Sequence, residues 1–270
     1  MCCTDPLISC LKAFGYSIVR MPTSDLEPLQ LMLRSGRALE RLGGLDAVLL
    51  TGRHARVPRI TRNRPAAAVT GRRTGQLDAG VGLTLLGSVL AAMGGSTVGV
   101  EAAYRSARSV TFEFQDVSED AIAVVDLDQY LADARVNPRA HHVATLLDRD
   151  DLYVTTAVVK SPAITVRAQD DTGIDLSVTV PALQQLIGGR VTISPADART
   201  SALTYAGVVP LAFGFRAVRL FYDHGRYGAF KPLAAGEAAL GRGDAAPEWL
   251  VDERPFVTLE NRRDEAQKQL

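Results

Sequence analysis

Residues 164–180 read ITVRAQDDTGIDLSVTV, and this stretch decides the predicted fold. Apolar and polar residues alternate on both sides of a central run, Asp170-Asp171-Thr172-Gly173. A period of two is typical of a strand with one buried and one solvated face, and a short run of Asp and Gly is typical of a tight turn. The stretch therefore predicts a β-hairpin over residues 164–180.

The same alternation recurs elsewhere in the chain. Val110, Phe112 and Phe114 alternate with polar residues, and apolar runs of strand length follow at 211–215 and 217–222. Residues 127–134 have a helical pattern, and residues 79–100 contain no charge but six glycines. Because helices and strands do not alternate strictly, we expect an α+β fold in which helices surround a twisted, mainly antiparallel sheet.

Composition narrows the class of protein. The chain has 270 residues, of which 47% are hydrophobic, so it has enough apolar material for a packed core. Lys and Arg equal Asp and Glu at 30 each, so the net charge gives no reason to expect a nucleic-acid partner. The cysteines, Cys2, Cys3 and Cys10, are too clustered for a disulfide framework, and no secretory signal pattern is present. We therefore expect a cytoplasmic protein.

The common catalytic and metal-binding motifs are missing from the sequence. It contains no Gly-x-Ser-x-Gly elbow and no phosphate-binding loop. The four histidines, His54, His141, His142 and His224, lack the spacing of metal ligands. We therefore predict that the protein is not an enzyme and has no metal site and no bound cofactor.

The chain changes character at Ala234. Residues 234–247 are mostly small, and residues 248–270 form a short tail that contains the single tryptophan. From Gly243 onward the chain has seven acidic and four basic residues, a net charge of −3, so the part before it carries +3. We predict a body at residues 1–233, a protease-sensitive loop at 234–247 and a tail at 248–270.

Several stretches, taken in order, resemble the gasdermins and specifically their short bacterial branch. These stretches are Met1-Cys2-Cys3, LKAFGY at 11–16, PTSDLEPL at 22–29, residues 75–99, VTFEFQDV at 110–117, DLYVTTAVVKS at 151–161 and PLAFGFR at 210–216. The resemblance extends over roughly the whole chain. It implies the fold of a gasdermin amino-terminal domain.

The resemblance also implies an autoinhibited pore-forming protein. In that family a protease removes the carboxy-terminal segment, and the body then oligomerises into a large β-barrel membrane pore. Bacterial members resemble one another in carrying a fatty acyl group on an amino-terminal cysteine, and they are similar to vertebrate relatives in killing the host cell, here in anti-phage defence. We therefore expect a cytoplasmic monomer before cleavage and a homo-oligomer among the lipids of the inner membrane afterwards.

Lipidation and cleavage positions follow from the same resemblance. For a palmitoyl or similar acyl group it favours Cys3, with Cys2 as the alternative. Arg242 is the only basic residue of the loop, so a caspase-like or trypsin-like activating protease is expected to cut after it. Leu240 is the alternative cleavage position.

The tail is expected to hold the body inactive. Trp249 and Phe256 are its large apolar residues, and we expect them to dock on the body as autoinhibitory anchors. The alternative is that the tail is simply a last strand that completes the sheet.

The apolar face of the predicted hairpin supplies the candidate membrane-inserting residues. These are Ile164, Val166, Ile174, Leu176 and Val178. Strands that span a bilayer need about 9–11 residues with one apolar and one polar face. Residues 79–100 are a second candidate, although an ordinary buried helix explains this stretch equally well.

Seven arginines and no acidic residue lie between Asp46 and Asp78. Arginine binds phosphate bidentately, so this stretch predicts a lipid headgroup site. The predicted headgroup residues are Arg53, Arg56, Arg59, Arg62 and Arg64. A solvated loop is the alternative, and a nucleic-acid site is not predicted because the stretch has no aromatic residues for base stacking.

Two other functions stay open at the level of the sequence. One is an acyl-anchored peripheral membrane protein that binds or scaffolds without forming a pore. The other is an enzyme of unrecognised class.

Overall fold

The computed structural model divides the chain into two compact units. It describes residues 11–12, 14–35, 38–52, 56–67, 69–71, 73–97, 100–147, 152–178, 180–187, 190–196, 201–223, 226–228 and 258–261. The first unit combines Met1–Asp25, Asn63–Glu119 and Val159–Gly214. The second unit combines Leu26–Arg62, Asp120–Val158 and Phe215–Leu270.

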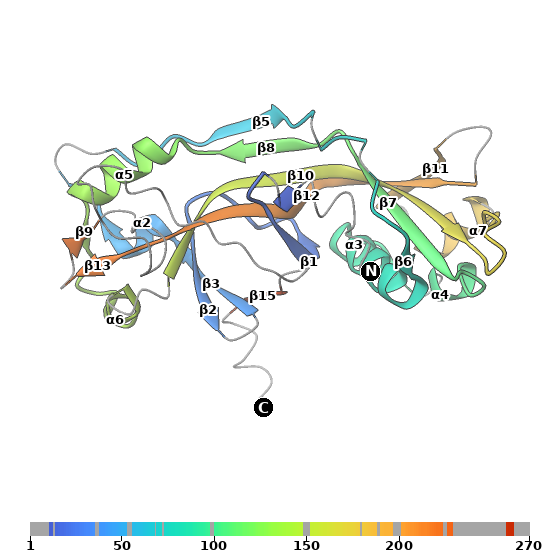
Figure 1. Ribbon diagram of the computed structural model, residues 1–270, viewed down its shortest axis with the longest axis horizontal. Coiled ribbons are helices and arrows are strands. Elements are labelled where there is room, and N and C mark those ends of the chain that lie inside the picture. Colours follow the sequence, from blue (N-terminus) through green and yellow to red (C-terminus); the bar gives the residue numbers. More distant parts are fainter. Residues whose placement is uncertain are drawn as a thin grey trace, which may run out of the picture. The chain divides into compact units, whose positions relative to one another are not determined.

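Four strands have residues in both units (Figure 1). They are β5 (Thr61–Pro65), β8 (Ser118–Ala121), β10 (Leu152–Gln169) and β12 (Leu203–Arg219). The first unit adds β1 (Ser17–Thr23), β6 (Leu77–Asp78), α3 (Ala79–Ala92), α4 (Val100–Ala103), β7 (Ser109–Gln115), α7 (Val180–Ile187) and β11 (Val191–Pro195).

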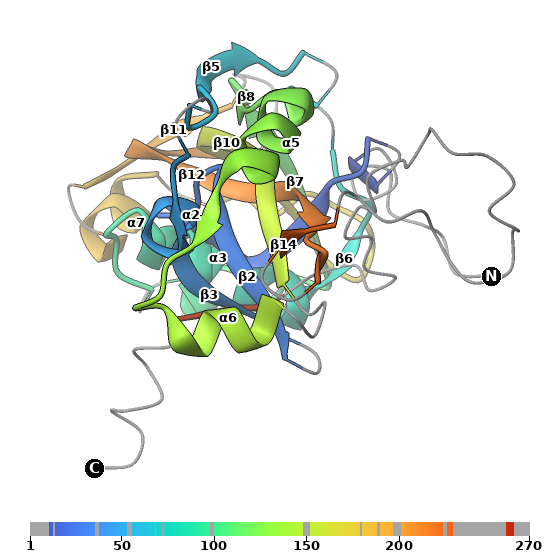
Figure 2. The ribbon, with the colours of Figure 1, turned by 90° about the vertical axis from the view of Figure 1, so that its left-hand side faces the viewer.

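The second unit holds the remaining elements. These are β2 (Gln30–Ser35), β3 (Ala38–Gly44), α2 (Leu45–Val48), β4 (Leu49–Leu50), α5 (Val124–Asp133), β9 (Arg135–Val136), α6 (His141–Leu147), β13 (Tyr222–Asp223), β14 (Arg226–Tyr227) and β15 (Thr258–Asn261). In Figure 2, α5 lies above α2 and α6 lies below it.

Strand pairing confirms the predicted fold class. β10 runs antiparallel to β2 and to β7, and the pairs β2–β3, β6–β7 and β11–β12 are antiparallel as well. β15 is different, because it runs parallel to β3. The helix predicted at 127–134 is confirmed as α5. The protein is therefore an α+β protein whose sheet is mainly antiparallel.

The core of the first unit is built from the alternating residues of β7 and β10. Val110, Phe112 and Phe114 are buried, while their neighbours in β7 stay partly exposed. The same alternation holds at the end of β10, from residue 164 to residue 169, where residues 164, 166 and 168 are buried. Phe114 stacks on Phe213 of β12 with ring centroids 3.9 Å apart. Alternation along each strand therefore places one face of the sheet in the core, as the period-two pattern predicted.

Helix α3 packs against β1 and β7 of the first unit. It begins where Asp78 caps it, because the Asp78 carboxylate accepts a hydrogen bond of 2.9 Å from the Gly80 amide. At Gly82 a Cβ atom would lie 2.7 Å from Cβ of Val110, so only glycine permits this close approach of helix and strand. The uncharged stretch at 79–100 is thus a helix over its first two-thirds.

The second unit has a core of its own. Leu127, Tyr130 and Leu131 project from one face of α5, and they pack with buried residues of β2 and β10, including Leu31 and Leu152. The spacing of these α5 residues at i, i+3 and i+4 is the spacing of one helix face. The helix α5, which follows β8 in the chain, therefore buries this face in the core of the second unit.

The prediction that residues 174–180 form the second strand of a hairpin is wrong. Residues 174–178 form no strand beyond a single bridge between Asp175 and Gln169, and α7 begins at Val180. The long partner of the end of β10 is instead β7, which pairs with it from Ala163 to Gln169. Residues 174–176 keep only short contacts with the end of β10, namely the Gln169↔Asp175 bridge and a hydrogen bond of 2.9 Å from the Leu176 amide to the Ala168 carbonyl.

The turn that precedes this arm does form. The Asp170 carboxylate accepts hydrogen bonds of 2.9 Å from the Thr172 and Ile174 amides, and Gly173 has a φ of +78°. The Thr172 hydroxyl donates a further hydrogen bond of 2.7 Å to this carboxylate. This bond and then the amide bonds stabilise the ionised form and lower the pKa of Asp170. The local turn chemistry was therefore predicted correctly, although the strand after it was not.

Candidate functional site

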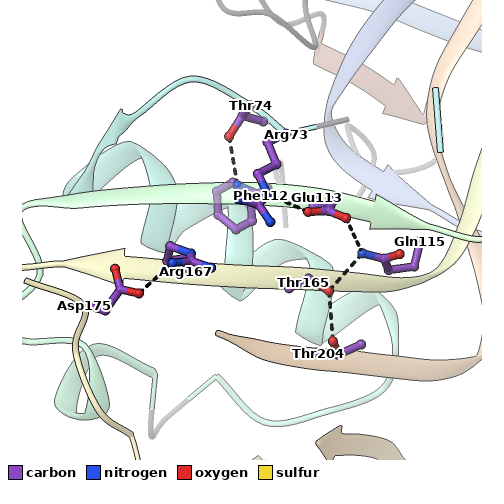
Figure 3. Close-up of polar contacts among 9 residues, drawn as sticks. All are labelled: Arg73, Thr74, Phe112, Glu113, Gln115, Thr165, Arg167, Asp175 and Thr204. Carbon is purple, nitrogen blue, oxygen red and sulfur yellow. Dashed lines mark hydrogen bonds and ion pairs between the residues drawn. The ribbon is translucent and has the colours of Figure 1, made fainter. Parts of the chain in front are cut away.

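The best-developed polar arrangement of the first unit lies on the partly exposed face of β7, β10 and β12 (Figure 3). We call it the polar strip, and it consists of Glu113, Gln115, Thr165, Arg167 and Thr204. Glu113 and Gln115 come from β7, Thr165 and Arg167 come from β10, and Thr204 comes from β12. Their alternation with buried residues is what brings them to one face.

Hydrogen bonds connect the polar strip across all three strands. Gln115 Nε2 donates to Glu113 Oε1 over 2.9 Å and to Thr165 Oγ1 over 3.2 Å. The hydroxyls of Thr165 and Thr204 lie 2.9 Å apart. The strands are thus joined by side chains as well as by backbone pairing.

Both charges of the polar strip are compensated by residues that flank it. Arg73 Nε donates to Glu113 Oε2 over 2.7 Å, and Arg167 Nη1 donates to Asp175 Oδ2 over 2.7 Å. Asp175 also accepts a bond of 3.0 Å from Gln169 Nε2. The strip lines an open groove of about 500 Å³. Because positive and negative side chains alternate along it, this face is hydrophilic without a strong net charge.

The opposite face of the same strands is apolar. Ile164 and Val166 are each 1% exposed, and Phe112 is fully buried opposite Val166. β10 has 18 residues and β12 has 17, so both are longer than the roughly 9–11 residues that a bilayer-spanning strand requires. In β10 the two faces differ only from Lys160 onward, because residues 152–159 are all buried. An apolar face, a hydrogen-bonded polar face and sufficient length are the properties of strands that cross membranes.

The predicted membrane-inserting residues divide into two groups. Ile164 and Val166 lie in β10, packed in the core of the first unit. Ile174 is 64% exposed, and Leu176 and Val178 are partly exposed in the irregular segment that precedes α7. The structure therefore pairs Ile164 and Val166 with β7 rather than with the other three residues. The alternation in residues 110–114 indicates that this segment is a strand, but it does not show which strand pairs with it.

The predicted headgroup arginines also divide. Arg62 pairs with Glu27 over 3.1 Å and with Asp120 over 3.6 Å, and the hydrogen bond that Arg62 donates to Glu27 raises the pKa of Arg62. Arg64 pairs with Glu119, which lies in the same unit. The structure places Arg56 and Arg59 in a separate groove of the second unit.

Six other predicted residues lie outside the described part of the chain, together with Arg53. They are Cys2, Cys3, Leu240, Arg242, Trp249 and Phe256. Of the predicted tail, the structure describes β15, which pairs with β3 from Thr258↔Ala38 to Asn261↔Arg41.

Among the described residues, no three His, Cys, Asp or Glu side chains come together as a potential metal site. Within the same residues, no helix combines the length and the hydropathy needed to cross a membrane. The buried phenols of Tyr104 and Tyr205 lie 2.6 Å apart, and burial raises the pKa of Tyr104 to about 12. At neutral pH both therefore stay protonated and serve as a buried hydrogen bond.

Comparison with known proteins gives a consistent result. The Bacterial Gasdermin Family matches residues 19–228. The gasdermin bGSDM of a Desulfuromonadales bacterium is 46% identical over 264 residues, covering 96% of this chain and 99% of that protein. The gasdermin bGSDM of Lysobacter enzymogenes is 39% identical over 257 residues, covering 93% and 95%.

A solved structure agrees with these sequence matches. The structure of a bacterial gasdermin from Bradyrhizobium tropiciagri aligns with a TM-score of 0.61 at 16% identity, covering 95% of this chain and 97% of that one. At this identity the alignment shows a common fold. The family predicted from the sequence is therefore confirmed, and the chain belongs to the bacterial gasdermins.

Proposed function

We propose that this gasdermin forms membrane pores from the strands that carry the polar strip. The observation that supports the proposal is the division of β7 and β10 into an apolar face, with Phe112, Ile164 and Val166, and a hydrogen-bonded polar face. In a barrel the apolar face would contact lipid, and the polar strip would line the aqueous lumen. A closed barrel also pairs every backbone amide, which the bilayer interior demands.

Before the strands can enter a membrane, their apolar face must become exposed, and α3, which packs against β7, must move away. The helix contains Gly80, Gly82 and Gly87, and each glycine costs roughly 1 kcal/mol of helix stability relative to alanine. It is therefore held in place mainly by packing against β1 and β7. A helix that depends on its packing is released once the strands beneath it rearrange.

Autoinhibition is proposed to come from the tail. β15 adds a parallel strand to β3, and Leu259 lies opposite the buried Leu39. This contact supports the idea that residues 248–270 dock on the body, with Trp249 and Phe256 as additional anchors. Loss of the tail also converts a neutral chain into a body of charge +3, which favours anionic lipid.

Activation is proposed to be proteolytic. A caspase-like or trypsin-like protease would cut after Arg242, or else after Leu240, within the loop at 234–247. Before the cut the protein would be a cytoplasmic monomer, and afterwards a homo-oligomer in the inner membrane. The death of the cell would then limit phage spread, so the protein would serve anti-phage defence.

An acyl group is proposed on Cys3, with Cys2 as the alternative, because bacterial gasdermins carry one on an amino-terminal cysteine. A palmitoyl chain adds about 0.8 kcal/mol of membrane affinity for each buried methylene. The intact protein is expected to lose one acyl mass on treatment with hydroxylamine, measured by mass spectrometry. An unchanged mass would remove lipidation from the proposal.

Pore formation is tested most directly by electrical recording. A planar anionic bilayer exposed to the chain cut within 234–247 is expected to show stepwise, persistent increases in conductance, because each assembled barrel opens an aqueous path. An acyl-anchored binding protein, which is the alternative function, would bind the bilayer and leave its conductance at the baseline. Binding without conductance would therefore select that alternative.

A further inference from the structure

A groove of about 520 Å³ in the second unit is independent of the polar strip. It lies between the segment 56–59 and one face of α5, and we call it the α5 groove. Its lining consists of Arg56, Val57, Pro58, Arg59, Asp126, Gln129, Tyr130 and Asp133. The four α5 residues have the spacing i, i+3, i+4 and i+7, which places them on one side of the helix.

The two arginines of the α5 groove differ from those of β5. Arg62 and Arg64 are occupied by carboxylates, whereas Arg56 and Arg59 make no ion pair or hydrogen bond with any other part of the chain that the structure describes. Both are exposed. Two guanidinium groups on one short segment are the donors that bind a phosphate group best.

The α5 side of the groove provides negative charge. Asp126 is exposed in the first turn of α5, and Asp133 lies at its end against Gly52, where a Cβ would come within 2.2 Å of the Asp133 carboxylate. Glycine at position 52 therefore lets the chain pass Asp133 closely. The groove thus has arginines along one wall and carboxylates along the other.

Tyr130 is the buried polar residue of this groove. Its side chain is 1% exposed, and Thr51 approaches its hydroxyl without forming a hydrogen bond of good geometry. Burial raises the pKa of this phenol, so the hydroxyl remains a donor at neutral pH. A buried hydroxyl with so poor a hydrogen bond is unfavourable, and a ligand oxygen in the groove would accept its proton.

We propose that the α5 groove binds a phosphate ester that also carries an ammonium group, that is, a phosphoethanolamine moiety. Arg56 and Arg59 bind the phosphate, the Tyr130 hydroxyl donates to a phosphate oxygen, and Asp126 with Asp133 binds the ammonium group. A simple anion would be repelled by the carboxylates, and a simple cation by the arginines. A zwitterion satisfies both walls.

The moiety could come from a membrane lipid or from free phosphoethanolamine, and the chemistry at the groove is the same. The inference rests on the proposed function in one respect: a protein that acts on membranes meets this moiety on membrane lipids. Binding here requires neither a cut in the chain nor the strands of the polar strip. It can therefore be measured on the intact, uncut protein.

The test measures co-sedimentation of the intact chain with vesicles that contain either phosphatidylethanolamine or phosphatidylglycerol. We expect preferential binding to the former, and a loss of about tenfold or more in affinity for Arg56→Gln with Arg59→Gln, since charge-assisted hydrogen bonds are lost. Arg139→Gln removes one positive charge from another exposed site of the second unit and should change nothing. Circular dichroism of each variant verifies folding.

Asp126→Asn gives a readout that a merely structural role would not produce. Removal of one carboxylate should shift the preference from phosphatidylethanolamine toward phosphatidylglycerol rather than weaken both. Tyr130→Phe should weaken phosphatidylethanolamine binding without such a shift. A folded Asp126→Asn variant with the wild-type preference would contradict the assignment of the ammonium wall.

Competition with free phosphoethanolamine distinguishes the two sources. Displacement from vesicles at millimolar or lower concentration identifies the free molecule as a ligand, whereas arginine-dependent vesicle binding without displacement identifies the lipid. Equal binding to both vesicles, unchanged by the arginine substitutions, overturns the inference. That result leaves bilayer conductance by the cut chain unaffected, so failure here and failure of pore formation are separate observations.

Discussion

Cutting the chain between residues 233 and 248 is expected to convert a protein that leaves anionic liposomes sealed into one that empties them. The loop holds the tail near β3 at an effective concentration on the order of millimolar, and dilution of the free tail to about micromolar lowers its occupancy by roughly a thousandfold. The body that remains carries +3 and is drawn to anionic lipid. The measurement is release of a trapped dye after a site-specific protease recognition sequence is placed within 234–247.

The controls for this experiment separate release from misfolding. The same protease added to the unmodified chain should cause no dye release. A synthetic peptide of residues 248–270, added in excess to the cut body before the liposomes, should restore the sealed state because β15 can pair with β3 in trans. Cut protein that stays monomeric and leaves the dye inside would contradict the proposed switch. The mass of the tail released in activated cells identifies the natural bond.

Breaking the β15 pairing should activate the chain without any cut. Along a strand the amides point alternately to the two sides, so the double change Leu259→Pro with Glu260→Pro removes the donor that faces β3 whichever residue supplies it. We expect dye release from the uncut double variant. Glu260→Gln, which removes the charge and keeps the amide, should remain silent. If the uncut double variant releases no dye, the contact that holds the body inactive lies in other residues of the tail.

Ile174→Arg is expected to abolish dye release by the cut chain while the uncut protein stays folded. Ile174 is 64% exposed in the soluble form, so arginine there buries no charge. If residues 174–178 extend β10 as a lipid-facing strand in the pore, the same arginine costs about 2–4 kcal/mol in each subunit at mid-membrane depth. Because a barrel repeats this cost in every subunit, assembly should fail. Dye release by the cut variant tests the loss of pore formation, and urea unfolding of the uncut variant tests that it stays folded.

Ser177→Arg is the matched control for Ile174→Arg. Ser177 is also exposed, but it lies on the opposite parity of the segment and would face the lumen of a barrel. This variant should therefore still release dye. Equal activity of the two variants would remove residues 174–178 from the membrane-spanning strand. In phage-infected cells, Ile174→Arg should raise plaque counts to those of cells without the gene, whereas Ser177→Arg should protect as the wild type does.

Much of the fold could be predicted from local pattern. The alternation of residues 110–114 and 164–168 identified two strands and their buried faces, since successive side chains of any extended chain point to opposite sides. The Asp170–Gly173 turn was predictable because its side-chain hydrogen bonds are formed within a few residues. The spacing of Leu127, Tyr130 and Leu131 likewise marked the buried face of α5.

The candidate site could be predicted only in part. The hairpin arm at 174–178 has the pattern of a strand, yet it keeps only a single bridge to β10, whose long partner is β7. Pairing of Arg64 with Glu119 and placement of Arg56 beside Asp126 join residues far apart in the sequence. A seven-arginine stretch therefore predicted one cationic site, and the fold divided it between ion pairs and the α5 groove.

By itself, the sequence determined which residues are apolar or polar on each strand, where the chain turns and where its charge is unequal. These properties depend on the covalent geometry of short segments, and the order of such segments also identified the gasdermin family. Only the tertiary structure decided that β7 forms the long pairing with β10 while residues 174–178 keep a single bridge to it, and that β15 pairs with β3. Strand partners compete for a limited number of edges, and that competition depends on the packing of the whole chain rather than on any one segment.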